Sequence, residues 1–228
     1  MKKLIVILFV VLLNSFAFSQ ETEWKTKNYI GFNVGGTMTS LFLIYNTDQA
    51  ANILYIDNPY LNSYSAGLSF KNFSERLVGI SIDLNYIEKG GYNGFVYDID
   101  TSLTLPAMFK YSSSYIELTP LMNIRVGKKR SHINIYAGPH ISWLINDKIE
   151  FITAVNEQRY KNTADNKFEF GLNAGAGYSF DFKRSSIELR FLYSHGLTDV
   201  FNPETSNPYH WFIQNQVMST SLAYYYKL

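Results

Sequence analysis

Six charged residues stand in segments that are otherwise built from apolar and small residues, and their types favour chemistry between opposite charges. Each has an apolar or aromatic neighbour on both sides: Asp83, Glu117, Arg125, Glu169, Glu188 and Arg190. Charges held in a narrow, partly dry interior are costly unless they are paired. We therefore expect a network of ion pairs and hydrogen bonds that fills an interior and fixes its register. The alternative is a gated pathway for protons or small ions.

A second set of residues carries the functional groups of a hydrolase. Ser194 supplies a nucleophile, His140 and His195 supply bases and Glu169 an orienting group, but hydrolysis needs these groups close together. Neither histidine belongs to a recognisable catalytic motif. No glycine-rich phosphate loop, HExxH motif or calcium loop occurs in the sequence either. We expect no cofactor, no metal and no catalysis, with a membrane-embedded hydrolase acting on lipid A or peptides as the alternative.

The elements that position these residues are strands, and the segment from Phe168 to Phe180 shows this best. Its even positions carry only apolar or aromatic residues, whereas its odd positions carry Glu, Gly, Asn and Ser. A strand with one face in apolar surroundings has this pattern, because successive side chains point to opposite faces. Glu169 then lies on the polar face.

Seven further segments alternate in the same way, so the sequence predicts eight strands. Their apolar sides run through Ile30–Met38, Tyr64–Phe70, Val78–Tyr86, Ile116–Val126, Ile133–Trp143, Ile187–Tyr193 and Leu222–Leu228. All six charged residues above fall on the opposite, polar sides. Short connections are expected at 72–75, 127–131 and 181–186, and long ones at 40–62, 90–114, 145–166 and 198–211.

Tight turns on one rim and long loops on the other are typical of an outer-membrane barrel. A soluble barrel also alternates, but its polar face meets water and is usually rich in Lys and Glu. Here the polar faces are mostly Gly, Ser, Asn and Thr, which fit the crowded interior of a small barrel. The prediction is an all-β fold, an eight-stranded antiparallel up-and-down transmembrane β-barrel whose termini both lie in the periplasm.

Aromatic residues near the strand ends support a membrane location. They make up 17% of the chain, and two aromatic bands flanking an aliphatic belt match the two membrane interfaces. The residues assigned to these bands include Trp143, Trp211, Tyr178, Phe180, Tyr224 and Tyr226.

Closure of the barrel follows from the hydrocarbon that surrounds it. Hydrocarbon offers no hydrogen bonds to an open sheet edge, so the first strand, near 30–39, must pair with the last, near 217–228. Pro120 and Pro139 each lack an N–H for the ladder. We expect bulges or missing hydrogen bonds at these two prolines.

The N-terminal segment has the composition of a secretory signal peptide. Lys2 and Lys3 precede an apolar run from Leu4 to Leu13, which is shorter than the ~20 residues of a membrane-spanning helix. We expect cleavage after residue 19 and a single domain over residues 20–228. Cleavage lowers the net charge from +1 to about −1, and without a basic tract we expect no nucleic acid partner. The absence of cysteine excludes disulfides and thiolate metal sites.

Five segments carry a resemblance through their order and spacing: LNYIEKGG (84–91), SYIELTPLMNIRVGKKR (114–130), IYAGPHISWLI (135–145), FGLNAGAGYSF (170–180) and IELRFLYSHGLTDV (187–200). Together they resemble the PorT-like outer-membrane β-barrel family of Bacteroidetes. Pro120 and the Gly138-Pro139 pair fall where that family usually has them, while Asn123 and Arg125 depart from its usual basic or aromatic residue after the first proline. The resemblance implies an eight-stranded outer-membrane barrel, often of unknown function. One branch of the family is linked to protein secretion.

The expected partners follow from this architecture. Outer-membrane lipid surrounds the barrel, and the barrel-assembly machinery is expected to read the alternating C-terminal residues Leu222, Tyr224, Tyr226 and Leu228. Loops on a rigid scaffold often carry function. The segments 41–64 and 151–167 are therefore candidates for binding a protein, a glycan or a secretion partner, and a merely solvated loop is the alternative for each.

Overall fold

The computed structural model describes residues 27–44, 55–56, 60–73, 77–99, 103–153, 157–161, 166–200 and 212–228. These residues form strands and connecting turns. The strands are β1 (Lys27–Ile44), β2 (Tyr55–Ile56), β3 (Leu61–Phe73), β4 (Val78–Ile99), β5 (Leu103–Lys128), β6 (Ser131–Thr153), β7 (Glu157–Lys161), β8 (Phe168–Asp181), β9 (Ser185–Gly196) and β10 (Phe212–Lys227).

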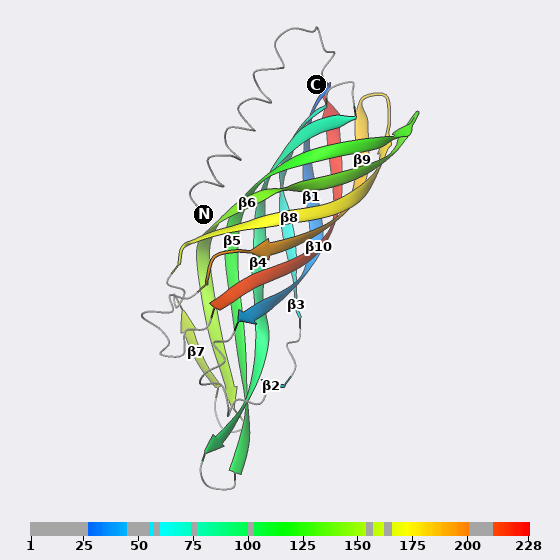
Figure 1. The fold of residues 1–228 in the computed structure, drawn as a ribbon. Coiled ribbons are helices and arrows are strands. Elements are labelled where there is room, and N and C mark those ends of the chain that lie inside the picture. The colour runs from blue at the N-terminus through cyan, green and yellow to red at the C-terminus, as the bar shows by residue number, and fades with distance from the viewer. Residues whose placement is uncertain are drawn as a thin grey trace, which may run out of the picture.

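Eight of these strands close into an antiparallel barrel (Figure 1), as the sequence predicts. Each of these eight strands pairs with its neighbours in the chain, and β1 pairs with β10 to complete the ring. The first and last strands pair along nearly their whole length, from Tyr29 opposite Lys227 to Ile44 opposite Phe212. Among the described residues of the lipid-facing wall, no sheet edge is therefore left open, and an unpaired backbone group there would have no partner.

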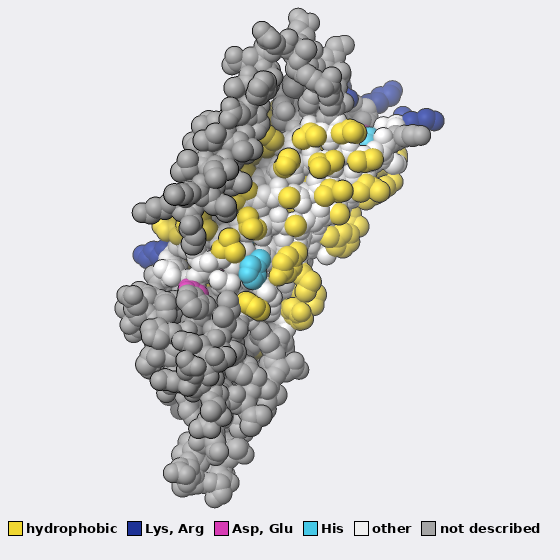
Figure 2. Space-filling view, viewed as in Figure 1, with side chains coloured by type: hydrophobic (Ala, Val, Ile, Leu, Met, Phe, Trp, Pro, Cys, Tyr) yellow, Lys and Arg dark blue, Asp and Glu magenta, His cyan; other side chains and the backbone are white. Residues whose placement is uncertain are grey.

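Most apolar side chains point outward from this wall, and most polar ones point inward, although apolar clusters such as Ile87, Tyr115 and Val217 are buried inside. Phe32, Leu68 and Leu172 are 55%, 64% and 55% exposed, whereas Asn33 and Ser69 are 5% and 2% exposed. Figure 2 shows the outward side chains as a broad apolar band across the visible face. This orientation is that of a membrane barrel, because a soluble barrel turns its apolar face inward.

The two prolines interrupt the ladder, as expected from their missing N–H groups. Between β5 and β6, pairing runs through Leu118 opposite Ile141 and resumes at Met122 opposite Ala137. Pro120 lies in the interval, and the register is unchanged on either side of it. The one register shift between these strands lies elsewhere, between Ser114 and Tyr115.

The expectation of long loops at 90–114 and 145–166 is wrong in large part. β4 continues to Ile99 and β5 begins at Leu103, so most of the first segment is a β-hairpin, and β6 continues to Thr153. The alternation ends near residue 86 although the strands do not. Here the inward face carries apolar side chains as well, since Leu41, Tyr111 and Ile149 are buried together with Val200. Hydropathy therefore no longer distinguishes the two faces of these strands.

The predicted signal peptide and Trp211 lie outside the described residues. Within the described ranges, no helix is long and apolar enough to cross a bilayer.

Candidate functional site

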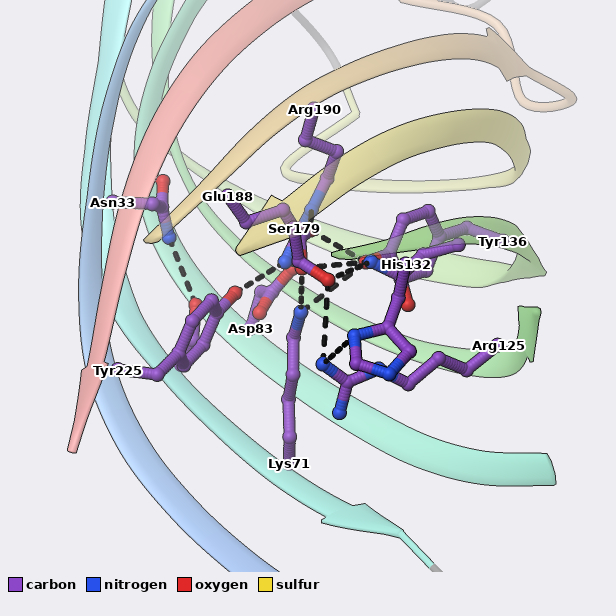
Figure 3. A network of polar contacts seen from close by, with 12 residues as sticks. Asn33, Lys71, Asp83, Arg125, His132, Tyr136, Ser179, Glu188, Arg190 and Tyr225 are labelled. Carbon is purple, nitrogen blue, oxygen red and sulfur yellow. Dashed lines mark hydrogen bonds and ion pairs between the residues drawn. The ribbon is translucent and has the colours of Figure 1, made fainter. Parts of the chain in front are cut away.

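The interior of the barrel holds two clusters of buried charge. The first, here called the Arg190 cluster, consists of Lys71, Asp83, Glu188 and Arg190 with the tyrosines Tyr136 and Tyr225 (Figure 3). β3, β4, β6, β9 and β10 contribute these residues, so the cluster connects strands on different sides of the interior. Its four charged side chains are 1–3% exposed, and their formal charges cancel.

Each carboxylate in the Arg190 cluster contacts a cation. The Arg190 Nη1 group donates to Asp83, and its Nε donates to Glu188 Oε1 at 3.0 Å. The Lys71 ammonium donates to Glu188 Oε2 at 2.5 Å and lies 4.1 Å from the centre of the Tyr225 ring. The hydroxyl of Tyr136 donates to Glu188 Oε1 at 2.5 Å. Paired in this way, buried charges fix the register of the strands that carry them.

Arg125 lies near the short-turn rim rather than in the Arg190 cluster. Its Nη2 group donates to Asp181 Oδ1 at 2.6 Å and lies 3.0 Å from His132 Nδ1. Ser179 connects Arg125 to the Arg190 cluster. It accepts hydrogen bonds from both Arg125 and Asn134, and Asn134 also donates to Glu188 Oε2 at 3.3 Å. The interior is thus closed toward this rim by a second polar layer.

The second cluster, here called the Lys89 cluster, lies farther from the short turns. The Lys89 ammonium is fully buried and contacts Glu117 Oε2 at 2.7 Å and Glu169 Oε1 at 2.5 Å. His140 Nε2 lies 3.2 Å from Glu169 Oε1, and Asn215 donates to Glu169 Oε2 at 2.5 Å. One ammonium therefore binds two carboxylates that would otherwise repel each other.

The Lys89 cluster also contains the donor set of a metal site. Glu117, His140 and Glu169 each place a ligand atom within 4.8 Å of the others. Carboxylate oxygen and imidazole nitrogen are common ligands for divalent metals. In this protein the ammonium of Lys89 contacts both carboxylates. The positive charge that a metal ion would supply therefore comes from Lys89.

Replacing Lys89 with methionine should destabilise the barrel by about 3–5 kcal/mol, since two buried carboxylates lose their cation. Added Zn²⁺ should recover part of this loss by binding Glu117, His140 and Glu169. The measurement is thermal unfolding in detergent micelles with and without Zn²⁺. The matched control carries Glu169→Gln as well and should lose the Zn²⁺ response. An equal response in both variants would place the metal elsewhere.

The six charged residues singled out from the sequence therefore separate into three groups. The structure brings Asp83, Glu188 and Arg190 together in one cluster, puts Glu117 and Glu169 in the other, and leaves Arg125 at the rim. The network predicted from the sequence omitted both lysines, although Lys71 falls on the polar side of its segment. Lys71 has the same parity as Ser69, and Lys89 has the same parity as Asp83. Continued alternation therefore places both lysines inside the barrel. Lys89 was missed because Gly90 and Gly91 suggested the start of a loop.

The hydrolase candidates do not form a nucleophile–base pair in the described part of the chain. Ser194 donates to Asn173. His195 follows on the opposite face, where its ring contacts Phe42 and its Nδ1 lies 3.4 Å from Gln216 Nε2. His140 does contact Glu169. However, the other group that contacts this Glu169 oxygen is the ammonium of Lys89 rather than a nucleophile.

The described aromatic residues assigned to the membrane interfaces lie on the outer surface. Trp143 is 59% exposed and stacks on Phe168 with 5.6 Å between the ring centres. Toward the short turns, the outward aromatic side chains are Tyr178, Phe180, Tyr224 and Tyr226, between 36% and 52% exposed.

Comparison with protein families gives a match that spans most of this chain. The model described as "Outer membrane protein beta-barrel domain" matches residues 18–202. No curated protein matches the chain at a significant level.

Solved structures of outer-membrane barrels show distant likeness. Ail, the attachment invasion locus protein of Yersinia pestis, is 14% identical with a TM-score of 0.37, and the match covers 89% of this chain and 99% of Ail. OprG from Pseudomonas aeruginosa is 11% identical with a TM-score of 0.38, over 89% of this chain and 96% of OprG. The outer membrane protease OmpT from Escherichia coli is 8% identical with a TM-score of 0.37, over 92% and 99% of the two chains.

Proposed function

The chain belongs to the family of outer membrane protein beta-barrel domains, and on that premise we propose that it is a non-catalytic binding scaffold of the outer membrane. In this proposal, the plugged barrel anchors a β-sheet that extends outside the cell and binds a protein or glycan there. The observation that carries the proposal is the unequal length of the strands. β8 and β9 have 14 and 12 residues, whereas β4, β5 and β6 have 22, 26 and 23.

The change in outward side chains marks where the longer strands leave the membrane. On β4 the outward residues are apolar from Val78 to Leu84, and on β5 from Val126 to Ile116. Beyond them come Glu88 on β4 and Ser114 on β5, which lie in the same register pair. From Glu88 to Ile99 the strand extends roughly 35 Å at ~3.3 Å per residue. A membrane-spanning strand needs only about 9–11 residues.

The extension is a sheet with its own edges. β2 pairs with β4 at Phe95 and Gly94, and β7 pairs with β6 from Lys148 to Ile152. Figure 1 shows the β4–β5 hairpin reaching past the ends of the other strands, with β2 and β7 beside it. A rigid sheet that projects from a membrane anchor offers backbone edges and faces to a partner.

The plugged interior supports a scaffold rather than a pore. Lys71, Lys89 and Arg190 cross the interior between strands and are 0–3% exposed. An eight-stranded barrel leaves space for little beyond its own side chains. The wild-type protein in planar lipid bilayers should therefore show no stable conductance of porin size. A reproducible large conductance would contradict the plug.

Site-specific photo-crosslinking on intact cells tests the scaffold proposal. A photoreactive residue at Tyr55, Tyr92 or Tyr160, on the projecting strands, should give an adduct of one defined mass. The same residue at Leu172, which faces lipid, should give none. If no position on the extension gives a specific adduct, the binding role fails.

A shortened hairpin supplies the matched control. Tyr92 and Lys110 are register partners, so an Asn-Gly turn can join them. This variant removes the pairing partners of β2 but leaves the lipid-facing wall complete. It should keep the heat-dependent mobility of a folded barrel and lose the adduct at Tyr55. Persistence of that adduct would show that the extension is not the binding element.

The finer assignment to the PorT-like branch belongs to the same proposal. It rests on the resemblance of the segments around Pro120 and Pro139, and it makes a subunit of an outer-membrane secretion assembly the second candidate role. Co-purification of one stoichiometric outer-membrane or periplasmic partner would support the secretion role. A change in lipid A mass upon deletion of the gene would instead support the hydrolase alternative.

A further inference from the structure

The rim of the barrel at the short turns is strongly basic. Six cationic residues, here called the basic ring, lie at the strand ends of this rim: Lys27, Lys129, Arg130, Lys183, Arg184 and Lys227. Among the described residues of these turns, Asp181 is the one acidic side chain, and it pairs with Arg125. The positive charge of the ring is therefore not balanced by its described surroundings.

Among the described residues, backbone hydrogen bonds join neighbouring parts of the basic ring. The backbone N–H of Asp181 donates to the carbonyl of Arg130 at 2.7 Å, and that of Lys227 donates to the carbonyl of Arg184 at 2.9 Å. Lys227 in turn lies opposite Tyr29, two residues from Lys27. Closely spaced cations on a rigid rim attract anions more strongly than isolated ones.

A recess of about 230 Å³ lies at the inner edge of the basic ring. Lys27, Arg125, Lys129 and His132 contribute cationic or basic groups to its lining, against the single carboxylate of Asp181. Asp181 is bonded to Arg125 at 2.6 Å, and neither Lys27 nor Lys129 forms an ion pair with a described residue. The recess therefore has the size and the charge to receive an anionic group.

The edge of the recess is apolar and adjoins the outward apolar wall of the barrel. Leu77 lines the recess and is 61% exposed, and Val78, the next residue, is 48% exposed on the lipid-facing wall. Phe182, beside Lys183, is 48% exposed. A ligand that fits this arrangement has an anionic head and an apolar chain. The head then contacts the lysines, and the chain contacts the apolar wall.

We propose that this recess, with the basic ring around it, binds the anionic headgroup of a phospholipid in the inner leaflet of the outer membrane. The phosphate lies between Lys27 and Lys129, and an acyl chain runs past Leu77 along β4. This site is independent of the scaffold role, since it lies at the opposite end of the barrel from the projecting sheet.

Lipid selectivity in nanodiscs tests the proposal. The mature protein is reconstituted with phosphatidylcholine and phosphatidylglycerol at about 4:1, and native mass spectrometry counts the lipids that stay bound after release. A lysine near an anionic surface contributes about a fivefold preference. Phosphatidylglycerol should therefore be enriched on the wild type, and Lys27→Gln with Lys129→Asn should lower that enrichment at least about fivefold. Asparagine suits position 129, where φ is 58°.

The matched control removes two lysines from the opposite end of the barrel, Lys110→Gln with Lys148→Gln, and should keep the enrichment. Heat-dependent mobility checks that both variants fold. If the first does not, raising NaCl from about 0.05 M to about 0.5 M on the wild type should itself erode the enrichment, because salt screens exposed charges.

Two further measurements separate a lipid from other anions. Leu77→Gln should weaken phosphatidylglycerol retention, and neither inorganic phosphate nor acidic peptidoglycan fragments should displace the lipid at equal concentration. Equal enrichment in wild type and Lys27→Gln with Lys129→Asn overturns the site. Displacement by phosphate or by peptidoglycan fragments, with no effect of Leu77→Gln, overturns its assignment to a lipid.

Discussion

Replacing Arg190 with methionine should lower the free energy of unfolding of the barrel by about 3–5 kcal/mol, because it leaves buried carboxylates without their cation. Asp83 is 1% exposed, and its described ion pair is with Arg190. Glu188 keeps Lys71, so most of the loss falls on Asp83. Urea unfolding in detergent micelles, followed by tryptophan fluorescence, measures the change.

Two comparison variants isolate the buried charge as the cause. Arg184→Met removes the same group from an exposed turn and should change stability by less than about 0.5 kcal/mol. Asp83→Asn added to Arg190→Met removes the orphaned charge, and this double variant should recover much of the loss. If Arg190→Met and Arg184→Met unfold at the same urea concentration, the Arg190 cluster contributes nothing to stability.

The strands, and the side of each strand that faces lipid, were predictable from the sequence. Lipid favours apolar side chains, whereas the barrel interior favours polar ones. On β8, the lipid-facing side chains are those of Phe168, Phe170 and Leu172, and the inward ones include Glu169 and Asn173. The alternation with a period of two results from this difference. Closure was predictable for a similar reason, since hydrocarbon leaves no alternative to pairing β1 with β10.

The partners inside the barrel were not predictable in this way. Parity assigns a side chain to a face, but it does not say which residues share a height across the interior. Lys71 and Glu188 are separated by 117 positions in sequence, and they meet only because the stagger between strands brings β3 and β9 to the same level. That stagger accumulates over the whole ring, whereas an alternation pattern reports one strand at a time.

The projecting sheet was missed for a different physical reason. From Glu88 on, the polar and apolar residues of β4 no longer separate by parity, so the pattern that identified the strand is lost while its hydrogen bonds to β5 continue. Backbone pairing leaves little trace in composition. The same limit applies to any strand that leaves a bilayer.

Deleting Tyr224–Leu228 should abolish assembly of the barrel in cells and in detergent. These residues complete the seam, with Tyr224 opposite Phe32 and Tyr226 opposite Ile30. They also pair with β9, where Tyr224 lies opposite Ile187. The deletion exposes backbone groups of both neighbours to hydrocarbon, at several kcal/mol for each unpaired group. A gel that compares boiled and unboiled membrane fractions measures the folded form.

A second variant distinguishes the backbone seam from a signal read by the assembly machinery. Tyr224→Ala with Tyr226→Ala keeps every backbone hydrogen bond of β10 but removes two outward aromatic side chains. If the machinery reads those side chains, this variant should refold in detergent and assemble poorly in cells, whereas the deletion should fail in both. A truncated chain that still shows heat-dependent mobility would mean that the ring can tolerate an open edge in lipid. The outward apolar wall would then need some other explanation for its stability, because closure is what allows these strands to lie in hydrocarbon.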